Sequence, residues 1–189
     1  MRLVLVSMLE DENTVLELAG LLSRVYPGVV VEVAARGAEP PPGSYDDARG
    51  QYRSEQILFA AAALREALGA DAVLVVAGVD AYADALNFVF GEALLGEGVA
   101  AVYTPRLRPE YYGYEPDKEL FMERLLKESM HELGHAFGLE HCPNPLCVMS
   151  FSNSILEVDR KKPAYCTRCA ARLRARGIRI AEEYVLYEA

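Results

Sequence analysis

The feature that most constrains this chain is the clustering of its metal-binding side chains between residues 131 and 169. Residues 131–149 read HELGHAFGLEHCPNPLCVM and contain all three histidines of the 189-residue chain: His131, His135 and His141. The four cysteines lie in this stretch or shortly after it, at Cys142, Cys147, Cys166 and Cys169. Because imidazoles and thiolates are preferred zinc ligands, we expect the fold to be organised around a metal-binding region.

The spacing of the histidines indicates how a metal would be held. His131 and His135 are four residues apart, which places both imidazoles on one face of a helix, one turn apart. Two imidazoles in that register can bind one Zn²⁺ at about 2.0–2.1 Å each. Gly138 is expected to end the helix in a left-handed conformation, so that the chain turns and brings His141 to the same ion as third ligand.

Glu132 follows the first histidine but points elsewhere, so it can hydrogen-bond a metal-bound water without occupying a coordination position. Three neutral nitrogens leave a fourth position open, as in catalytic rather than structural zinc sites. Zinc lowers the pKa of a bound water to about 7, and Glu132 is placed to take its proton. The alternative interpretation is that the three histidines are solvated helix or loop residues.

The histidine spacing matches HExxHxxGxxH, the extended zincin motif that is the signature of the metzincin peptidases. Metzincins also carry a methionine in a turn beneath the metal, and Met149 in the segment CVMSF is the candidate here. The longer pattern, HExxHxxGxxHCx4CxM followed by CxxC, closely resembles the archaemetzincins. The resemblance is specific over residues 131–169 and looser over residues 78–107. It implies a zinc metalloprotease that acts on peptide or protein substrates.

The same resemblance implies that the four cysteines hold a second, structural zinc ion. Their spacing supports this independently, because two short-spaced pairs separated by a loop suit a tetrahedral site with Zn–S distances of about 2.3 Å. Two disulfide bonds are the alternative; these are uncommon in the cytosol but occur in hyperthermophiles. We therefore expect two zinc ions per chain, one catalytic and one structural.

The chain length suits one catalytic domain, which we divide into two subdomains. Residues 1–141 are expected to form a metzincin-like subdomain with a sheet, a backing helix and the active-site helix. Residues 142–189 are expected to form a small subdomain with the methionine turn and the four-cysteine zinc knuckle. No apolar run approaches the roughly 20 residues of a membrane span, and Met1–Met8 is too short for a signal peptide. We therefore expect a cytoplasmic monomer without a membrane partner.

Hydrophobic periodicity predicts an α/β (α+β) fold, with a mixed, mostly parallel, twisted sheet backed by helices. Strands are expected at residues 2–7, 29–35, 71–77, 87–95 and 98–103, and helices at residues 10–25, 51–68, 117–137 and 169–177. Residues 36–50 and 150–165 are expected to be loops, and residues 178–187 a strand or a helix. We interpret Asp80 and Asp84 as turn residues rather than as an acid–base pair.

Two segments before the metal helix are candidates for binding substrate. By its order along the chain, Phe88–Glu92 matches the edge strand that metzincins place above the cleft, where an extended peptide adds as a further strand. Residues 104–116 are expected to be a flexible loop that covers the cleft, or else a plain surface loop. In that loop Arg106 or Arg108 can clamp a substrate carboxylate, and a tyrosine such as Tyr111 can stabilise an oxyanion.

The net charge of −9 argues against a general nucleic-acid-binding surface. A local exception is a basic cluster composed of Arg160, Lys161, Lys162, Arg168, Arg172, Arg174, Arg176 and Arg179. We interpret this cluster as a solvated face. The alternative function is a zinc-stabilised binding protein that contacts nucleic acid or a partner through the cysteine site and this cluster. That function would not require Glu132 or His141. A third hypothesis is hydrolysis of non-peptide bonds by the same activated water.

Overall fold

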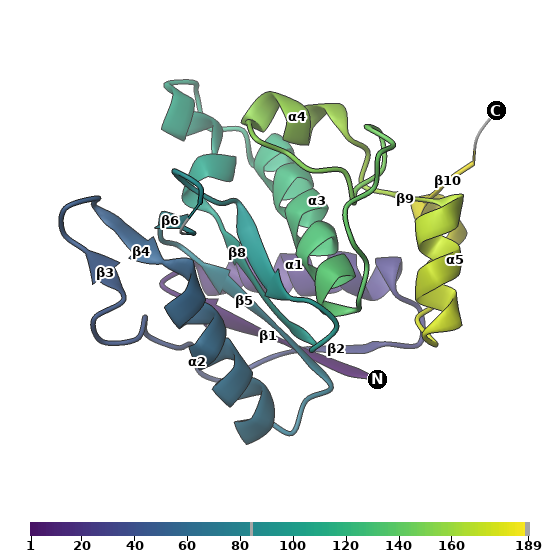
Figure 1. Cartoon of the computed structure of the whole chain (residues 1–189), viewed down its shortest axis with the longest axis horizontal. Coiled ribbons are helices and arrows are strands. Elements are labelled where there is room, and N and C mark those ends of the chain that lie inside the picture. The colour runs from purple at the N-terminus through teal and green to yellow at the C-terminus, as the bar shows by residue number, and fades with distance from the viewer. Residues whose placement is uncertain (84, 188–189) are drawn as a thin grey trace.

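A computed structural model describes residues 1–83 and 85–187 of the chain. At its centre is a five-stranded sheet in the order β2-β1-β5-β8-β7 (Figure 1). The strands of this sheet are β1 (Arg2–Met8), β2 (Val30–Val33), β5 (Ala72–Ala77), β7 (Gly91–Leu94) and β8 (Val99–Tyr103). Neighbouring strands are parallel except that β7 runs antiparallel to β8. The predicted mixed, mostly parallel sheet is therefore confirmed.

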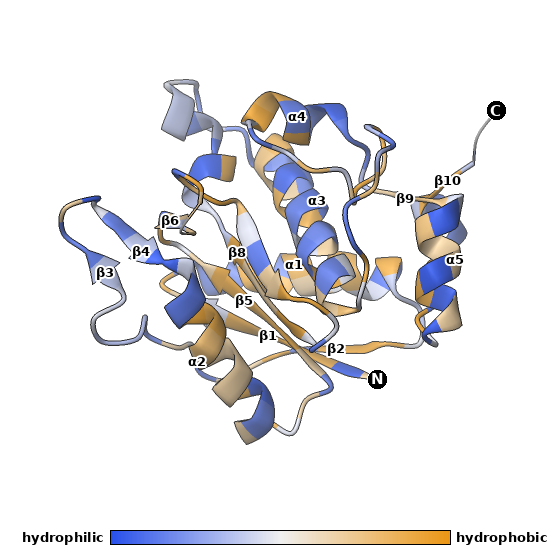
Figure 2. Ribbon diagram, in the orientation of Figure 1, coloured by the Kyte–Doolittle hydropathy of each residue, from blue (hydrophilic) through white to orange (hydrophobic). Residues whose placement is uncertain are grey.

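Helices cover both faces of this sheet, which explains why every residue of β5 is buried. Side chains alternate along a strand, so Leu74 and Val76 pack toward α1 (Glu12–Val25) and α3 (Lys118–Ala136). Val73 and Val75 belong to a second apolar cluster on the opposite face, with α2 (Ser54–Ala67). Figure 2 shows the hydrophobic strands enclosed between the helices. Each such buried side chain contributes about 1.5–3 kcal/mol relative to full exposure.

The helix α3 begins and ends one residue inside the predicted range 117–137. The carboxylate of Asp117 accepts a hydrogen bond from the backbone N–H of Leu120 at 3.0 Å and so caps the first turn. The helix ends at Ala136, and Gly138 follows with a φ of +94°, a left-handed conformation that favours glycine. The predicted end of the helix and the reversal of the chain toward residue 141 are both confirmed.

The region before α2 differs from the prediction. Gln51–Arg53 is not helical but forms β4, and it lies in a second sheet of order β3-β4-β6. The outer strands are β3 (Tyr45–Asp46), inside the predicted loop, and β6 (Ala81–Tyr82). Packing between the rings of Tyr45 and Tyr52, 4.9 Å apart, and a hydrogen bond from the Tyr82 hydroxyl to Asp46 at 2.8 Å stabilise these short strands.

Residues 150–165 also contain more structure than the predicted loop. The C-terminal elements are α4 (Ile155–Arg160), β9 (Tyr165–Cys166), α5 (Thr167–Ala175), η3 (Glu182–Tyr184) and β10 (Val185–Leu186), with β10 parallel to β9. One continuous apolar cluster contains residues from both sides of residue 141. Within it, the hydroxyl groups of Tyr26 and Tyr165 form a hydrogen bond of 2.5 Å. The C-terminal segment therefore packs onto the same core as the sheet.

The segments that flank the edge strand are shorter or more ordered than expected. The strand predicted at residues 87–95 is reduced to β7, and Val89 forms only an isolated bridge with Ala81. Residues 104–116 contain two 3₁₀ helices, η1 (Pro105–Leu107) and η2 (Pro109–Tyr112), rather than an irregular loop. No helix within residues 1–83 and 85–187 is both long and apolar enough to cross a membrane.

Candidate metal centre and cleft

The last two turns of α3 and the chain reversal at Gly138 bring the three histidines together. The Nε2 atoms of His131 and His135 are 3.1 Å apart. The ring of His141 lies 5.3 Å from that of His131 and 4.7 Å from that of His135, measured between centroids. One nitrogen from each ring lies within 4.8 Å of the others, although the three residues range from buried to exposed.

Hydrogen bonds orient two of these rings for metal binding. The Nδ1–H of His131 donates to the carbonyl of Val148 at 2.8 Å, and that of His135 donates to the carbonyl of Leu139 at 2.6 Å. Because a carbonyl only accepts, the proton lies on Nδ1 and the lone pair on Nε2 faces the other rings. Burial, with a smaller effect from the positive charge of Lys161, lowers the pKa of His131 well below its usual value. These neutral, converging nitrogens fit a zinc ion.

Met149 is fully buried, and its side chain packs against α3 at Gly134. Its backbone carbonyl accepts a hydrogen bond from the N–H of Cys142 at 2.9 Å, which ties the methionine segment to the residue after His141. A Cβ at Gly134 would collide with the Sδ of Met149, so the close approach of the methionine to α3 requires glycine there. Sequence reasoning missed Gly134, although its place between the first two histidines was a usable signal.

Glu132 is buried against the edge strand and lines the cleft. Burial raises the pKa of its carboxyl group well above the usual value, and the negative charges of Glu128 and Glu92 act in the same direction, while Lys161 opposes them. A Cβ at Gly91 would lie 2.5 Å from the Cγ of Glu132 and 2.8 Å from the carbonyl oxygen of Ala101. Gly91 of β7 therefore provides the space that Glu132 occupies, and the sequence analysis did not identify it.

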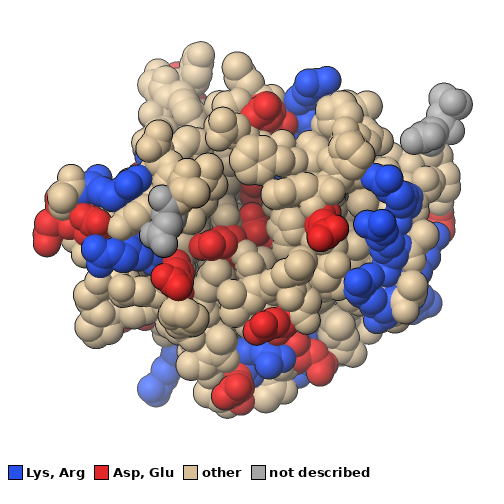
Figure 3. Space-filling model, in the orientation of Figure 1, with Lys and Arg blue, Asp and Glu red and all other residues tan. Residues whose placement is uncertain are grey.

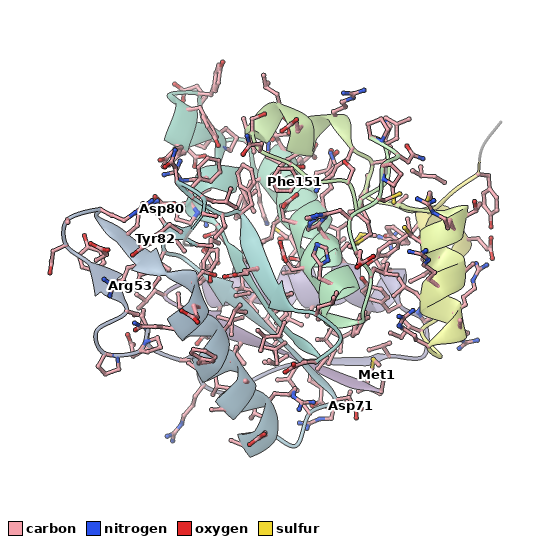
Figure 4. The ribbon with its side chains drawn as sticks, in the orientation of Figure 1. Met1, Arg53, Asp71, Asp80, Tyr82 and Phe151 are labelled. Carbon is pink, nitrogen blue, oxygen red and sulfur yellow. The ribbon has the colours of Figure 1, made fainter. Side chains whose placement is uncertain are left out.

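A cleft of about 490 Å³ opens beside the histidines. One side of the cleft consists of residues before and within β7, including Phe88. The other side is Phe151–Asn153, which follows the methionine turn. The floor contains Glu128, Glu132 and the three histidines. Phe151, labelled in Figure 4, contacts His141 edge-on, with ring centroids 5.3 Å apart and an interplanar angle of 69°. The site is therefore accessible from solvent on one side.

The arginines proposed as substrate clamps have other partners. Both guanidinium contacts of Arg106 go to the carboxylate of Asp80, at 2.6 and 2.8 Å, and its plane lies over Phe88. Arg108 forms an ion pair with Glu10 at 2.7 Å. Neither arginine lines the cleft, nor does Tyr111, so the structure does not bring these three side chains to the histidines. Asp80 (Figure 4) is therefore an ion-pair partner of Arg106. Asp84 lies outside the described residues.

The four cysteines form a second group, and all four are buried free thiols. Their sulfur atoms lie within 4.8 Å of one another, and the Sγ atoms of Cys142 and Cys166 are 3.8 Å apart. Disulfide sulfurs are about 2.05 Å apart, so the two-disulfide alternative is wrong. Zn–S distances of about 2.3 Å in a tetrahedron place the sulfurs about 3.8 Å apart, which the group matches. A hydrogen bond with Cys169 lowers the pKa of the Cys147 thiol.

Most of the basic cluster is exposed, as predicted, and Figure 3 shows a group of Lys and Arg side chains over α5. Lys161 is the exception, since it is fully buried and forms an ion pair with Glu128 at 2.7 Å. The interpretation of Lys161 as part of a solvated face is therefore wrong, because its ammonium group is held under the cleft rather than in water.

Comparisons with known proteins agree with this geometry. The sequence model of Peptidase family M54 matches residues 11–175. The archaemetzincin of Pyrococcus furiosus is 52% identical over 133 residues, which cover 70% of this chain and 69% of that protein. The crystal structure of the Archaeoglobus fulgidus archaemetzincin aligns with a TM-score of 0.78 at 37% identity, covering 91% of this chain and 99% of that one. A zinc-dependent peptidase from Methanocorpusculum labreanum aligns with a TM-score of 0.82 at 29% identity, covering 92% and 100%.

Proposed function

The chain belongs to Peptidase family M54, the archaemetzincins, and is a zinc metallopeptidase; from that premise we propose which of its residues carry out the reaction. His131, His135 and His141 would hold the catalytic zinc. Cys142, Cys147, Cys166 and Cys169 would hold a second, structural zinc. The observation that carries this proposal is the convergence of three imidazoles, two of them oriented by backbone carbonyls, beside Glu132 at the floor of an open cleft.

A zinc ion held by the three histidines would supply a Lewis acid to acidify water and polarise a peptide carbonyl. Glu132 acts as the general base, taking the proton of the attacking water, and then as the acid that gives it to the departing amine. Burial favours this role, because it raises the pKa of the carboxyl group and makes the carboxylate a stronger base. The contacts of Nδ1 with the carbonyls of Val148 and Leu139 keep the two helical imidazoles in place.

We further propose that a peptide substrate binds in extended form along β7. This strand pairs with β8 on one side and has no second paired neighbour among the described strands. An open strand edge offers backbone N–H and C=O groups to a peptide, while the side chains lining the cleft choose among residues. Phe88 and Phe151 are the aromatic side chains that contact the substrate in this proposal.

We also propose that the protein acts in the cytoplasm, because the reducing conditions there keep cysteine thiols such as these four from forming disulfides.

The test is metal analysis combined with cleavage of a peptide library, comparing the native protein with Glu132→Ala. Two zinc ions per chain are expected in both proteins, with cleavage in the native protein and a loss on the order of 10²–10⁴-fold in the variant. Glu140→Gln is the matched control, because Glu140 also lines the cleft but is exposed; its turnover should remain close to native. Undiminished cleavage by Glu132→Ala would contradict the assigned role, and one zinc per chain would contradict the second site.

A further inference from the structure

The helix α3 buries a row of charged side chains along the face that leads to Glu132. Arg124, Glu128 and Glu132 follow one another at intervals of four residues and are 6%, 3% and 5% exposed. Residues at this spacing share one helix face. Burying charged groups is costly unless each one has a partner of opposite charge. The partners of Arg124 and Glu128 therefore identify the segment that packs on this face of α3.

Both partners come from the segment that follows the methionine turn. The guanidinium group of Arg124 donates to both carboxylate oxygens of Asp159, at 2.7 Å each. One turn further along α3, the carboxylate of Glu128 lies 2.7 Å from the ammonium group of Lys161. Lys161 also donates to the backbone carbonyl of Ser150, at 3.4 Å. Two ion pairs, one helical turn apart, thus attach residues 150–161 to the metal-binding helix.

The two pairs differ in their distance from the cleft. Glu128 lines the cleft floor, and Ser150 immediately precedes Phe151–Asn153, which form one wall. Arg124 and Asp159 are not among the residues that line the cleft. Lys161 therefore connects the floor of the cleft at Glu128 with the start of its wall at Ser150. A second contact, from the N–H of Asn153 to the carboxylate of Glu157 at 2.6 Å, secures the other end of the wall to α4.

We propose that Glu128 and Lys161 are positioning residues of the peptidase reaction, because their ion pair fixes the wall Phe151–Asn153 relative to the floor of the cleft. The inference rests on the proposed function, since the wall would contact bound peptide. Phe151, which begins the wall, also packs against His141. Loss of the pair would let the wall move away from α3 and weaken peptide binding, without removing any group that reacts.

The experiment compares the double variant Glu128→Gln/Lys161→Met with Arg124→Met/Asp159→Asn, which removes the matched pair one turn away. Removing both charges avoids leaving one of them buried without a partner. For the first variant we expect KM to rise on the order of tenfold with little change in kcat. Amide hydrogen exchange in residues 150–154 should become faster, with zinc content unchanged. For the second we expect a lower unfolding temperature but native KM.

The single variant Glu128→Gln provides the conservative comparison, because its amide oxygen keeps a polar atom facing the ammonium group of Lys161. It should keep KM and hydrogen exchange closer to native than the double variant does. If the cleft-side double variant showed native KM and native exchange in residues 150–154, the positioning role would be overturned while the peptidase assignment stood. If the native protein cleaved no peptide, the proposed function would fail, and hydrogen exchange alone would decide whether the pair holds the wall.

Discussion

The three-histidine group and the four-cysteine group are neighbours in sequence but differ in their exposure. The histidines range from buried to exposed and face an open cleft, whereas all four cysteines are buried. His141 and Cys142 are adjacent, yet they belong to different groups. An open ligand set leaves room for a substrate, while a closed set of four thiolates can only hold the chain together. The exposure of the ligands to a cleft, rather than the identity of the metal, therefore distinguishes a site that can bind substrate from a site that can only stabilise the fold.

The two groups also depend on the fold in different ways. The backbone of α3 and its reversal at Gly138 already place the histidines, and carbonyl groups orient two of their rings. The cysteines instead bring together the loop after α3, β9 and α5. A metal held by them links segments that are distant in sequence, so its binding free energy becomes folding free energy. The variants Cys147→Ser and His135→Gln test this contrast.

Cys147→Ser should have the largest effect. Structural zinc contributes roughly 10 kcal/mol in small zinc domains, and loss of one buried thiolate should remove much of that contribution. We expect a large fall in the unfolding temperature, one zinc or none per chain, and loss of activity with the fold. Circular dichroism melting and metal analysis measure this. A variant that kept the native unfolding temperature would show that the cysteine group does not stabilise the fold.

His135→Gln should abolish peptide cleavage while preserving the fold, because its ring contributes to the open group only. The free energy of unfolding should change by about 1 kcal/mol or less, apart from the lost stabilisation by the catalytic zinc. One zinc per chain should remain. Activity assays, metal analysis and urea denaturation check this result. Unfolding as severe as that of Cys147→Ser would erase the distinction between the two groups.

Gly91→Ala should lower turnover on the order of tenfold to a hundredfold, since the added Cβ would displace Glu132 or push β7 outward. Zinc content should remain native, which kinetics and metal analysis together can establish. Gly20→Ala is the matched control, because a Cβ at this helical position of α1 has no heavy atom within 4 Å. That control should stabilise the protein by about 0.5–1 kcal/mol and leave turnover native. Equal turnover in both variants would remove the proposed link between β7 and Glu132.

Arg106→Gln should have the smallest effect. Its ion pair with Asp80 is partly exposed, so the free energy of unfolding should fall by about 1 kcal/mol or less. KM and kcat should remain native, because Arg106 does not line the cleft. Urea denaturation and steady-state kinetics provide the measurements. A marked rise in KM would instead support the substrate clamp that the sequence suggested.

The convergence of the three histidines could be predicted from sequence because their spacing acts within one helix and one turn, where local geometry is fixed. The central sheet was predictable for a similar reason, since long apolar runs such as Ala72–Ala77 identify buried strands. The small sheet β3-β4-β6 was not predictable, because strands of two or three residues show no periodicity.

The residues whose roles depend on distant partners were the ones that sequence reasoning misplaced. Arg106 and Arg108 looked available for substrate, but Asp80 and Glu10, far away along the chain, neutralise them. Lys161 looked like one member of a basic surface. The sequence signal lay in its ion-pair partner Glu128. This glutamate is one turn before Glu132 on a helix whose inner face had to be buried, so it required a buried cation as its partner.

The most direct test of the contrast between the two groups is a chelator titration that follows zinc per chain, peptide cleavage and circular dichroism in the same samples. We predict that the first zinc leaves together with activity while the secondary structure remains, and that the second zinc leaves only as the chain unfolds. Loss of both ions in one step with unfolding, or full activity after the first has gone, would contradict the division into an open reactive site and a closed structural one.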